Sequence, residues 1–450
     1  MPETSRRARG TGGSTGSGHG GEDRAGRQGR SPDTSARPES IVVEARSFEI
    51  QLPDHPIYGE DARDPGARLL AGLIEVGERD AVLVVGGGSG LVPVVAARLA
   101  RWGKVVVFTD QLPEAKQVEE ALRLNRVAAA RVARAADLSD LRDEVFDVAI
   151  LGTALEPSRE TLALHVRQAA LCLRPGGRLY LHGGKREGIE SAAGLVREVL
   201  GNVATLGYKK GHRVLVSERG ESVHADWDAK PPSVVEVGVG GEQLEIETRP
   251  GVFAGGALDE GTRVLVEALV VNPGDEALDL GCGSGIVGLY IARRATAGRV
   301  VLADSDLGAV ELARRNAARN GVGNTEIVST DGYSALAERR FDLIACNPPF
   351  HVGRIQSTAV VEGFVAEAPA HLRPGGRLYL VANRFRRYES LFPDAFERPE
   401  AVAETSRYRV LRATIGRPEE RRSREDADAE APLSPEVRGA SERTTRRPGR

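Results

Sequence analysis

The six residues from Cys346 to His351 read Cys-Asn-Pro-Pro-Phe-His and combine groups that can hold a reactive amine. Two consecutive prolines make the backbone rigid and remove two N–H donors, which leaves adjacent carbonyl oxygens to accept from a ligand. The side-chain oxygen of Asn347 and the carbonyl oxygen of Pro348 can accept the two protons of a planar exocyclic amine, which aims the nitrogen lone pair at an electrophile. Phe350 offers a ring on which an extruded base can stack, worth about 1–3 kcal/mol. We therefore predict that Asn347, Pro348 and Phe350 form a catalytic group that works by positioning, without a metal.

A glycine-rich turn precedes this segment and is predicted to bind a cofactor. Asp279 begins the run Asp-Leu-Gly-Cys-Gly-Ser-Gly, in which Gly281 and Gly283 let a ligand approach the backbone because they have no Cβ. The spacing is G-x-G-x-G, whereas dinucleotide sites have G-x-G-x-x-G. The carboxylate of Asp279 suits a ligand with an ammonium group better than one with a pyrophosphate.

Two further aspartates are expected at the ends of the next two strands. Asp304 lies 25 residues after Asp279, where a carboxylate can accept hydrogen bonds from two ribose hydroxyls, as in both NAD-type and S-adenosylmethionine-type sites. Asp331 can accept from the exocyclic amine of adenine. Each aspartate alone is equally compatible with a helix cap or a turn, but three at successive strand ends favour a nucleoside cofactor.

Short apolar runs and amphipathic segments alternate around these residues. Because the runs are continuously apolar, we predict strands buried on both faces, in a parallel sheet covered by helices. The Pro-Gly-Gly before the last run is predicted as a tight turn, and Gly321 as a helix C-terminal cap. Strands are predicted at Glu276–Leu280, Arg299–Ala303, Thr325–Ser329, Phe341–Cys346 and Arg377–Ala382, and helices at Ile286–Ala295 and Asp306–Asn320.

An internal repeat shows that this arrangement is present twice. The string LRPGGRLYL begins at Leu173 and again at Leu372, an offset of 199. The glycine turn recurs at Gly86–Gly90 and Gly281–Gly285, an offset of 195. The predicted fold class is α/β, with two tandem doubly wound, Rossmann-like domains that arose by duplication.

Composition divides the rest of the chain. Both termini are rich in Gly, Ser, Arg and Pro and poor in large apolar residues, so we expect them to be disordered. A polar segment with two prolines, DWDAKPPS, is the expected linker. The predicted boundaries are a tail at 1–40, the first domain at 41–225, the linker at 226–233, the second domain at 234–416, and a tail at 417–450.

The first copy lacks the residues expected to do the chemistry. Val84 replaces Asp279, and the amine-holding segment becomes Gly152-Thr153-Ala154-Leu155. Asp110 is aligned with Asp304, and the glycines of the turn remain. Transfer chemistry is therefore excluded in the first copy, whereas weak cofactor binding stays open.

The chain has a formal net charge of −3, so any nucleic-acid partner must be held by local basic patches. In the first domain Lys185, Arg186, Lys209 and Lys210 are candidates for contact with a nucleic acid. In the second, Arg384 and Arg386 alternate with aromatic residues. An uninvolved solvated face is the competing interpretation for each cluster.

Three cysteines, Cys172, Cys282 and Cys346, are too widely spaced for a disulfide framework or a metal site, which favours a reducing, cytosolic compartment. Cys282 and Cys346 are expected to be small buried residues rather than nucleophiles. No stretch approaches the roughly 18 apolar residues that span a bilayer.

Taken together, DLGCGSG, the acid of LADSD, STD and NPPFH resemble the class I S-adenosylmethionine-dependent methyltransferases that act on amino groups. The duplication, NPPFH, the segment from Pro250 to Phe253 and Leu258-Asp-Glu-Gly261 resemble the bacterial ribosomal RNA guanine-N2 methyltransferases, from about Ile41 to Gly416. The resemblance implies that Gly281, Gly283, Asp304 and Asp331 contact S-adenosylmethionine, that Phe253 closes over it, and that the first domain helps to bind RNA.

Three other functions remain open. Methyltransferases of protein glutamine or of adenine share the Asn-Pro-Pro-aromatic logic, although they usually have Tyr in the fourth position. A non-enzymatic RNA-binding or assembly factor on a decayed fold is the second, and a nicotinamide-dependent dehydrogenase is the third.

Overall fold

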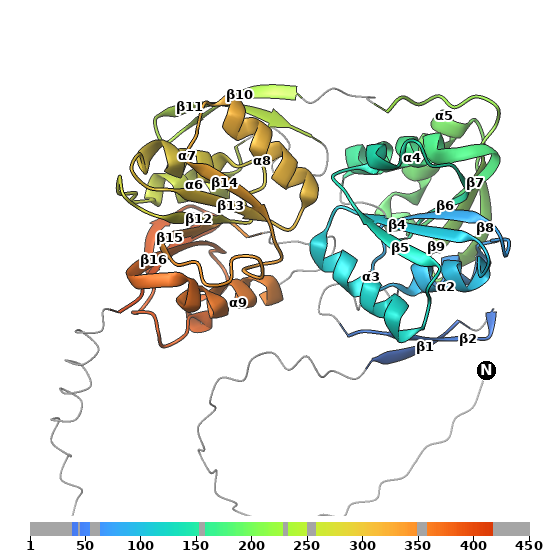
Figure 1. The fold of residues 1–450 in the computed structure, drawn as a ribbon, viewed down its shortest axis with the longest axis horizontal. Coiled ribbons are helices and arrows are strands. Elements are labelled where there is room, and N and C mark those ends of the chain that lie inside the picture. Colours follow the sequence, from blue (N-terminus) through green and yellow to red (C-terminus); the bar gives the residue numbers. More distant parts are fainter. Residues whose placement is uncertain are drawn as a thin grey trace, which may run out of the picture. The chain divides into compact units, whose positions relative to one another are not determined.

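A computed structural model describes residues 38–43, 46–54, 64–152, 158–227, 233–249, 258–348 and 358–416. These residues form two seven-stranded sheets with the same topology (Figure 1). The strand orders are β5-β4-β3-β6-β7-β9-β8 and β14-β13-β12-β15-β16-β18-β17. The predicted duplication of a doubly wound α/β fold is confirmed.

The second domain carries the candidate chemistry. Its sheet consists of β12 (Ala277–Leu280), β13 (Val300–Asp304), β14 (Thr325–Ser329), β15 (Phe341–Cys346), β16 (Leu372–Asn383), β17 (Glu400–Glu404) and β18 (Tyr408–Thr414). Its helices are α6 (Glu260–Ala268), α7 (Ile286–Arg294), α8 (Leu307–Arg319) and α9 (Thr358–Glu367), and a hairpin of β10 (Ser233–Val239) and β11 (Glu242–Thr248) precedes them.

The first domain repeats this plan. Its sheet consists of β3 (Ala81–Val85), β4 (Lys104–Thr109), β5 (Ala130–Arg134), β6 (Phe146–Leu151), β7 (Leu173–Gly184), β8 (Ala204–Lys209) and β9 (His212–Glu218). Its helices are α1 (Pro65–Leu73), α2 (Leu91–Leu99), α3 (Leu112–Leu124), α4 (Arg159–Cys172) and α5 (Ile189–Leu200), preceded by the hairpin of β1 (Glu39–Val43) and β2 (Phe48–Leu52).

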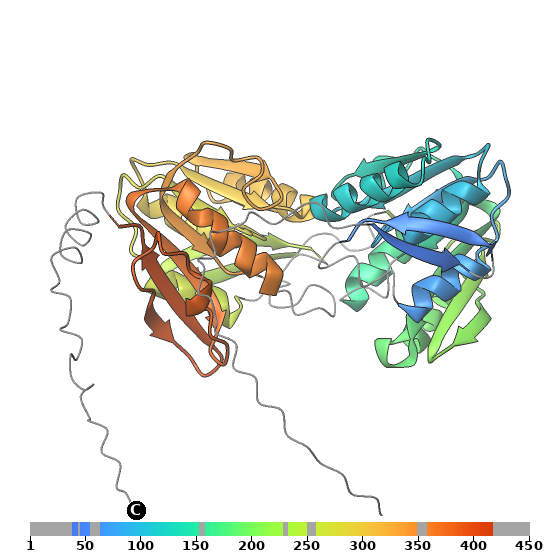
Figure 2. The same cartoon turned by 90° about the horizontal axis from the view of Figure 1, so that it is seen from below.

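Helices cover both faces of each sheet (Figures 1 and 2). In the second domain, α6, α7 and α8 pack with the β10–β11 hairpin on one face, and α9 packs on the other. The five strands from β14 to β16 are parallel, so their carboxyl ends meet at one edge. This edge is where α/β sheets bind ligands.

Most predicted elements lie within one residue of their observed bounds, and Gly321 caps α8 with a φ of 62°. The prediction of a parallel sheet is incomplete. The structure adds two antiparallel strands, β18 and β17, at the edge of the sheet next to β16. The Pro-Gly-Gly lies inside β16 rather than before it. It produces a register jump, since Phe341 pairs with Leu372 but Leu343 pairs with Arg377.

The predicted boundaries differ from the structure at two points. Glu39 and Ser40, assigned to the tail, belong to β1, because Glu39 pairs with Leu52 and Ser40 with Gln51. Ser233, assigned to the linker, is the first residue of β10. Residues 1–37 and 417–450 lie outside the described residues.

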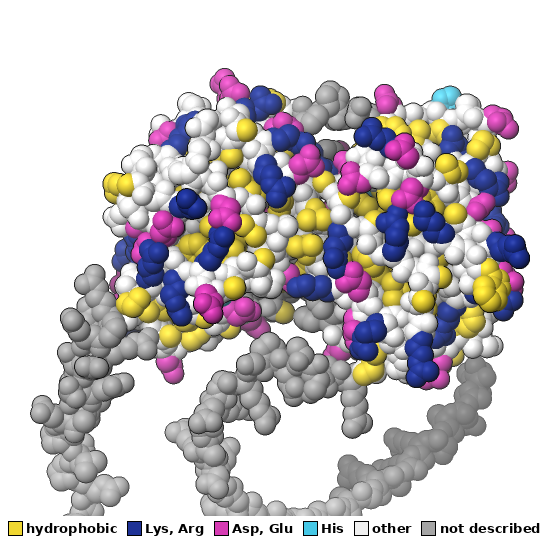
Figure 3. All heavy atoms as spheres, viewed as in Figure 1, with side chains coloured by type: hydrophobic (Ala, Val, Ile, Leu, Met, Phe, Trp, Pro, Cys, Tyr) yellow, Lys and Arg dark blue, Asp and Glu magenta, His cyan; other side chains and the backbone are white. Residues whose placement is uncertain are grey.

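No helix within the described ranges is both long enough and apolar enough to cross a bilayer. Lysine and arginine side chains are interspersed with aspartate and glutamate over the face seen in Figure 3. This mixture agrees with the small net charge, and it means that an anionic partner has to be recognised by local groups.

Candidate active site

The carboxyl ends of three neighbouring strands bring the predicted residues to one level. Leu280 of β12 is in register with Ala303 of β13 and with Cys346 of β15. The residues that follow these three positions are Gly281, Asp304 and Asn347, which therefore leave the sheet side by side. The Gly281 amide donates to the Ala303 carbonyl at 2.8 Å, which fixes the turn to β13.

The glycine turn has a backbone that other residues rarely adopt. Gly281, Gly283 and Gly285 have φ values of 76°, 53° and 89°. A Cβ at Gly281 or Gly283 would meet no described atom within 4 Å, whereas one at Gly285 would lie 3.1 Å from Leu302. The first two glycines thus face open space at the strand ends, as a ligand-binding turn requires.

Asp304 lies half-buried beside this turn. Its Oδ2 accepts from the Gly283 amide at 2.8 Å and its Oδ1 from the Asp306 amide at 2.9 Å. Each oxygen keeps a lone pair that can accept from a hydroxyl. Burial, with a contribution from the charge of Asp306, raises the pKa of Asp304 to about 6.

Asp279 is buried, at 2% exposure. Its Oδ2 accepts from the Gly288 amide of α7 at 2.7 Å, so one carboxylate oxygen holds the helix to the sheet. Burial, and then the charge of Asp304, raises the pKa of Asp279 to about 7 in spite of that hydrogen bond. A nearby cation stabilises the ionised form of such a buried carboxyl group.

Asp331 is half-buried two residues beyond β14. The preceding Thr330 donates its amide to the Asp304 carbonyl at 2.8 Å, which ties the Asp331 loop to the end of β13. The structure therefore brings Asp279, Asp304 and Asp331 to adjoining strand ends.

Asn347 is half-buried and Pro348 is buried directly after β15. The Asn347 Nδ2 donates to Thr262 Oγ1 at 3.0 Å and lies 3.3 Å from Asp259 Oδ1. Its Oδ1 is buried and has no hydrogen-bond partner among the described residues. A buried unpaired acceptor is costly, so this oxygen is set to receive a donor from a ligand. Phe350 and Phe253, the other two predicted residues, lie outside the described residues.

The cysteines of the site are inert. Cys282 and Cys346 are buried, and burial raises the pKa of each thiol well above its usual range. The negative charges of Asp279 and Asp304 act in the same direction. Neither thiol supplies a thiolate, in agreement with the sequence.

The basic clusters of the first domain come together. Lys185 and Arg186 form a short 3-10 helix after β7, and the Lys185 amide donates to the Gly211 carbonyl of the β8–β9 turn at 3.2 Å. Lys209 and Lys210 enter the same turn, and all four basic side chains are exposed. Tyr208 beside them is 66% exposed.

The two predicted arginines after β16, Arg384 and Arg386, differ in exposure. Arg384 is exposed and donates to the Thr405 carbonyl at 3.1 Å, and Phe385 is 82% exposed. Arg386 is half-buried and hydrogen-bonds Tyr388. Arg384 and Phe385 therefore face solvent, whereas Arg386 is partly committed to packing.

The first copy has a different arrangement at the corresponding strand ends. Val85 is in register with Phe108, as Leu280 is with Ala303, so the residue that corresponds to Asp304 is Thr109. The predicted match with Asp110 is wrong by one position. The Thr109 hydroxyl donates to Glu114, a buried acid on α3, and Glu114 Oε1 accepts from the Gly88 amide at 2.7 Å.

Glu114 thus makes the contact to the glycine turn that Asp304 makes in the second copy. The hydrogen bond from the Gly288 amide to Asp279 has lost both partners in the first copy. Val84 occupies the position of Asp279, and Pro93, which has no N–H, occupies the position of Gly288. These exchanges disfavour cofactor binding in the first domain.

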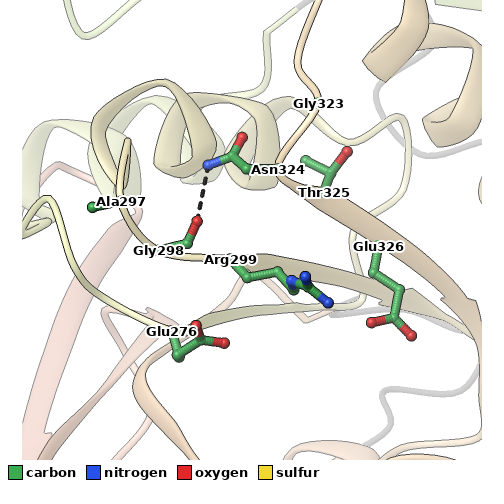
Figure 4. Close-up of a pocket in the computed structure, with 8 residues that line it drawn as sticks. All are labelled: Glu276, Ala297, Gly298, Arg299, Gly323, Asn324, Thr325 and Glu326. Carbon is green, nitrogen blue, oxygen red and sulfur yellow. Dashed lines mark hydrogen bonds between the residues drawn. The ribbon is translucent and has the colours of Figure 1, made fainter.

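A pocket of about 660 Å³ opens at the opposite end of the second sheet (Figure 4). Its lining residues Glu276, Arg299 and Asn324 directly precede β12, β13 and β14. None of the predicted site residues lines it. It faces the amino ends of the strands and is separate from the candidate site.

The family model described as the methyltransferase small domain matches residues 50–216 and 243–412. Ribosomal RNA small subunit methyltransferase C of Pseudomonas entomophila (strain L48) is 38% identical over 275 residues, which are 60% of this chain and 80% of the relative. The enzyme of that name from Pseudomonas putida (strain KT2440) is 35% identical over 61% of this chain and 81% of its own length. The chain belongs to the ribosomal RNA small subunit methyltransferase C family.

A solved member of the ribosomal RNA small subunit methyltransferase C family has the same fold. The T. thermophilus 16S rRNA N2 methyltransferase RsmC, in complex with AdoMet and guanosine, is 28% identical with a TM-score of 0.68. The match covers 84% of this chain and 98% of that one. The predicted family is confirmed.

Sequence reasoning missed two residues near the site. No motif singles out Thr262, and Asp259 stands out only within the Leu258-Asp-Glu-Gly261 segment. Their proximity to Asn347 is invisible along the chain, because 85 and 88 residues separate them from it. The one available signal was the Leu258-Asp-Glu-Gly261 segment, which resembles the same family.

Proposed function

We propose that the second domain transfers a methyl group from S-adenosylmethionine to the exocyclic amino group of a guanine in ribosomal RNA. One observation carries this proposal: the buried Oδ1 of Asn347 has no hydrogen-bond partner among the described residues, and Asn347 leaves the sheet at the same level as Gly281 and Asp304. The names of the relatives and the complex of RsmC with AdoMet and guanosine support the cofactor and the base. We assign the reaction to the cytosol, where free thiols such as Cys346 persist.

The described residues fit this cofactor. Gly281 and Gly283 face open space, so the backbone can approach a nucleoside closely. The remaining lone pairs of Asp304 suit the ribose hydroxyls, and Asp331 suits the adenine amine. Asp279, whose ionised form is disfavoured by burial, is stabilised by an ammonium group. Phe253 is proposed to cover the cofactor.

S-adenosylmethionine supplies an electrophilic methyl group when bound, and the chain's own residues orient the acceptor. Asn347 Oδ1 and the Pro348 carbonyl oxygen each accept a hydrogen bond from one N–H of the guanine amine, and the nitrogen loses one of these protons to solvent as the methyl group is transferred. This grip draws the nitrogen from planar toward tetrahedral geometry, so its lone pair is localised and directed at the methyl group. Phe350 stacks on the extruded base. Catalysis then rests on orientation, which can supply a large part of a rate enhancement.

We also propose that the first domain holds the RNA. Lys185, Arg186, Lys209 and Lys210 gather around one turn, and the exposed ring of Tyr208 lies beside them. Positive side chains contact phosphates, and an exposed ring can stack on an unpaired base. Arg384 and Phe385 supply a smaller group of the same kind after β16.

The test is methyl transfer from labelled S-adenosylmethionine to purified small-subunit, large-subunit and naked ribosomal RNAs, followed by mapping of the modified nucleoside. We expect N2-methylguanine as the product. Asn347→Ala should retain cofactor affinity and lose at least about 100-fold in kcat, because the amine is no longer aligned. Equal activity of this variant, or methylation of another base, would refute the assignment.

A further inference from the structure

We propose that Thr262 and Asp259 are positioning residues, which fix the Asn347 amide with its oxygen toward the substrate amine. The inference rests on the proposed function and extends it to residues outside the Asn-Pro-Pro-Phe segment. The three side chains form a relay that runs from Asn347 through Thr262 to Asp259. Asp259 is the N-cap of α6, and Thr262 lies in the first turn of that helix.

The direction of the relay follows from the donors available. Thr262 Oγ1 donates its single proton to Asp259 Oδ2, so toward Asn347 it can only accept. An ionised Asp259 has no proton to donate. The Asn347 group that lies 3.0 Å from Thr262 Oγ1 and 3.3 Å from Asp259 Oδ1 must therefore be the NH2 end.

A flipped amide would place the Asn347 oxygen against two other acceptors, one of them charged. Oxygen and nitrogen of an amide are distinguished by such a network, which here allows one orientation. In that orientation Oδ1 is buried and has no partner within the part of the chain that the structure describes. The relay thus presents an acceptor to the substrate and keeps the amide's own protons away from it.

The first domain provides an internal comparison. At the same offset of 195, Asp64 corresponds to Asp259, Ala67 to Thr262 and Gly152 to Asn347. Asp64 still caps α1 and accepts from the Gly66 amide at 2.7 Å. Capping therefore needs neither the hydroxyl nor the amide. The domain that lacks Asn347 also lacks the hydroxyl that would orient it.

Gly261 shows how closely the helix approaches the amide. A Cβ at this position would lie 3.0 Å from Asn347 Oδ1 and 3.0 Å from Asp259 Oδ1. A side chain at this position therefore requires the Asn347 amide or the Asp259 carboxylate to shift by a few tenths of an ångström. An added methyl group would push on the oxygen that receives the substrate.

The experiment compares Thr262→Val, which keeps the shape and removes the hydroxyl, with Thr262→Ser, which restores it. We measure kcat, the KM for ribosomal RNA, the Kd for S-adenosylmethionine by calorimetry, and Tm. Thr262→Val should lower kcat about 10- to 100-fold with the cofactor Kd changed less than about twofold, and Thr262→Ser should recover most of the rate. A wild-type kcat for Thr262→Val, or no recovery with Thr262→Ser, would overturn the proposal.

A double-mutant cycle separates positioning from general damage. In an Asn347→Ala background, Thr262→Val should change kcat by less than about twofold, because there is no amide left to orient. If the loss in kcat of the double variant equals the product of the losses of the two single variants, the relay is contradicted. Failure of the wild-type protein to methylate any RNA would instead refute the proposed function itself.

Gly261→Ala gives a second, independent arm if Thr262→Val lowers Tm. It should reduce kcat at least about tenfold with little change in cofactor Kd. The matched control is Gly274→Ala, since a Cβ there meets no described atom within 4 Å. Equal kcat values for the two alanine variants would contradict the close approach on which the relay depends.

Discussion

Two buried carboxyl groups define the electrostatics of the site at the scale of single residues. Burial raises the pKa of Asp279 to about 7 and that of Asp304 to about 6. Each group binds a proton more tightly in the folded, unliganded protein than in the unfolded chain, where its pKa is about 4. Their contribution to folding stability is therefore fully present below about pH 4 and is lost as the pH rises through 6 to 7.

Cofactor affinity should follow the opposite course. An ammonium group favours the ionised form of Asp279, so the affinity for S-adenosylmethionine should rise about tenfold between pH 6 and pH 8 as this carboxyl ionises. Calorimetric Kd values across that range measure the effect. Asp279→Asn cannot ionise and should bind weakly, without the rise centred near pH 7. A wild-type Kd that is constant over this interval would contradict the prediction.

The residues of the site were largely predictable because they follow apolar runs that end at the same edge of a parallel sheet. Asp279, Asp304, Asp331 and Asn347 were identified in this way. The Asp110 alignment failed because it departs by one position from the offset of 195 that relates the two glycine turns. That offset pairs Asp304 with Thr109, and the sheet register agrees. Hydrogen-bond partners such as Thr262 could not be predicted, because contacts between segments far apart in the sequence do not affect the local spacing of residues.

At the scale of elements, the edge strands and hairpins were missed. The residues of β17 are exposed or half-buried, and the β10–β11 hairpin alternates exposed and buried residues. Neither element therefore has the continuous apolar run of a central strand. In both copies an asparagine after a helix, α3 or α8, attaches the hairpin by hydrogen bonds. Asn125 pairs through its amide with the Gln51 backbone, and Asn320 pairs in the same way with Glu245.

Asn316 adds a second attachment in the catalytic copy only. It is fully buried, its Oδ1 accepts from the Glu247 amide at 2.8 Å, and its Nδ2 donates to the Glu247 and Ser284 carbonyls. Asn316→Ala should destabilise the protein by about 1–3 kcal/mol, because buried backbone groups lose their partners. Urea denaturation measures this free energy of unfolding.

Arg314→Ala on the exposed side of α8 is the matched control and should change stability by less than about 0.5 kcal/mol. Because Ser284 belongs to the glycine turn, Asn316→Ala should also weaken cofactor binding. A stability equal to that of the control variant would show that the buried amide is dispensable.

At the scale of the whole molecule, duplication has separated two tasks. The second copy keeps the open glycine turn, the strand-end acids and the oriented amide. In the first copy the buried Glu114 occupies the turn, and the exposed basic residues cluster elsewhere on the domain. With a net charge of −3, the chain as a whole does not attract RNA, so binding has to depend on such clusters.

Replacing Lys185, Arg186, Lys209 and Lys210 together by alanine should lower RNA affinity and flatten its dependence on salt. Each lost phosphate contact reduces the slope of log K against log salt by about 0.7 to 0.9, so four contacts correspond to a change of about 3. Filter binding at several salt concentrations measures it. The control removes the same charge from exposed arginines of the first domain, Arg79, Arg142, Arg159 and Arg197. If both quadruple variants have the wild-type slope, the cluster is a solvated surface, and the RNA must be held elsewhere.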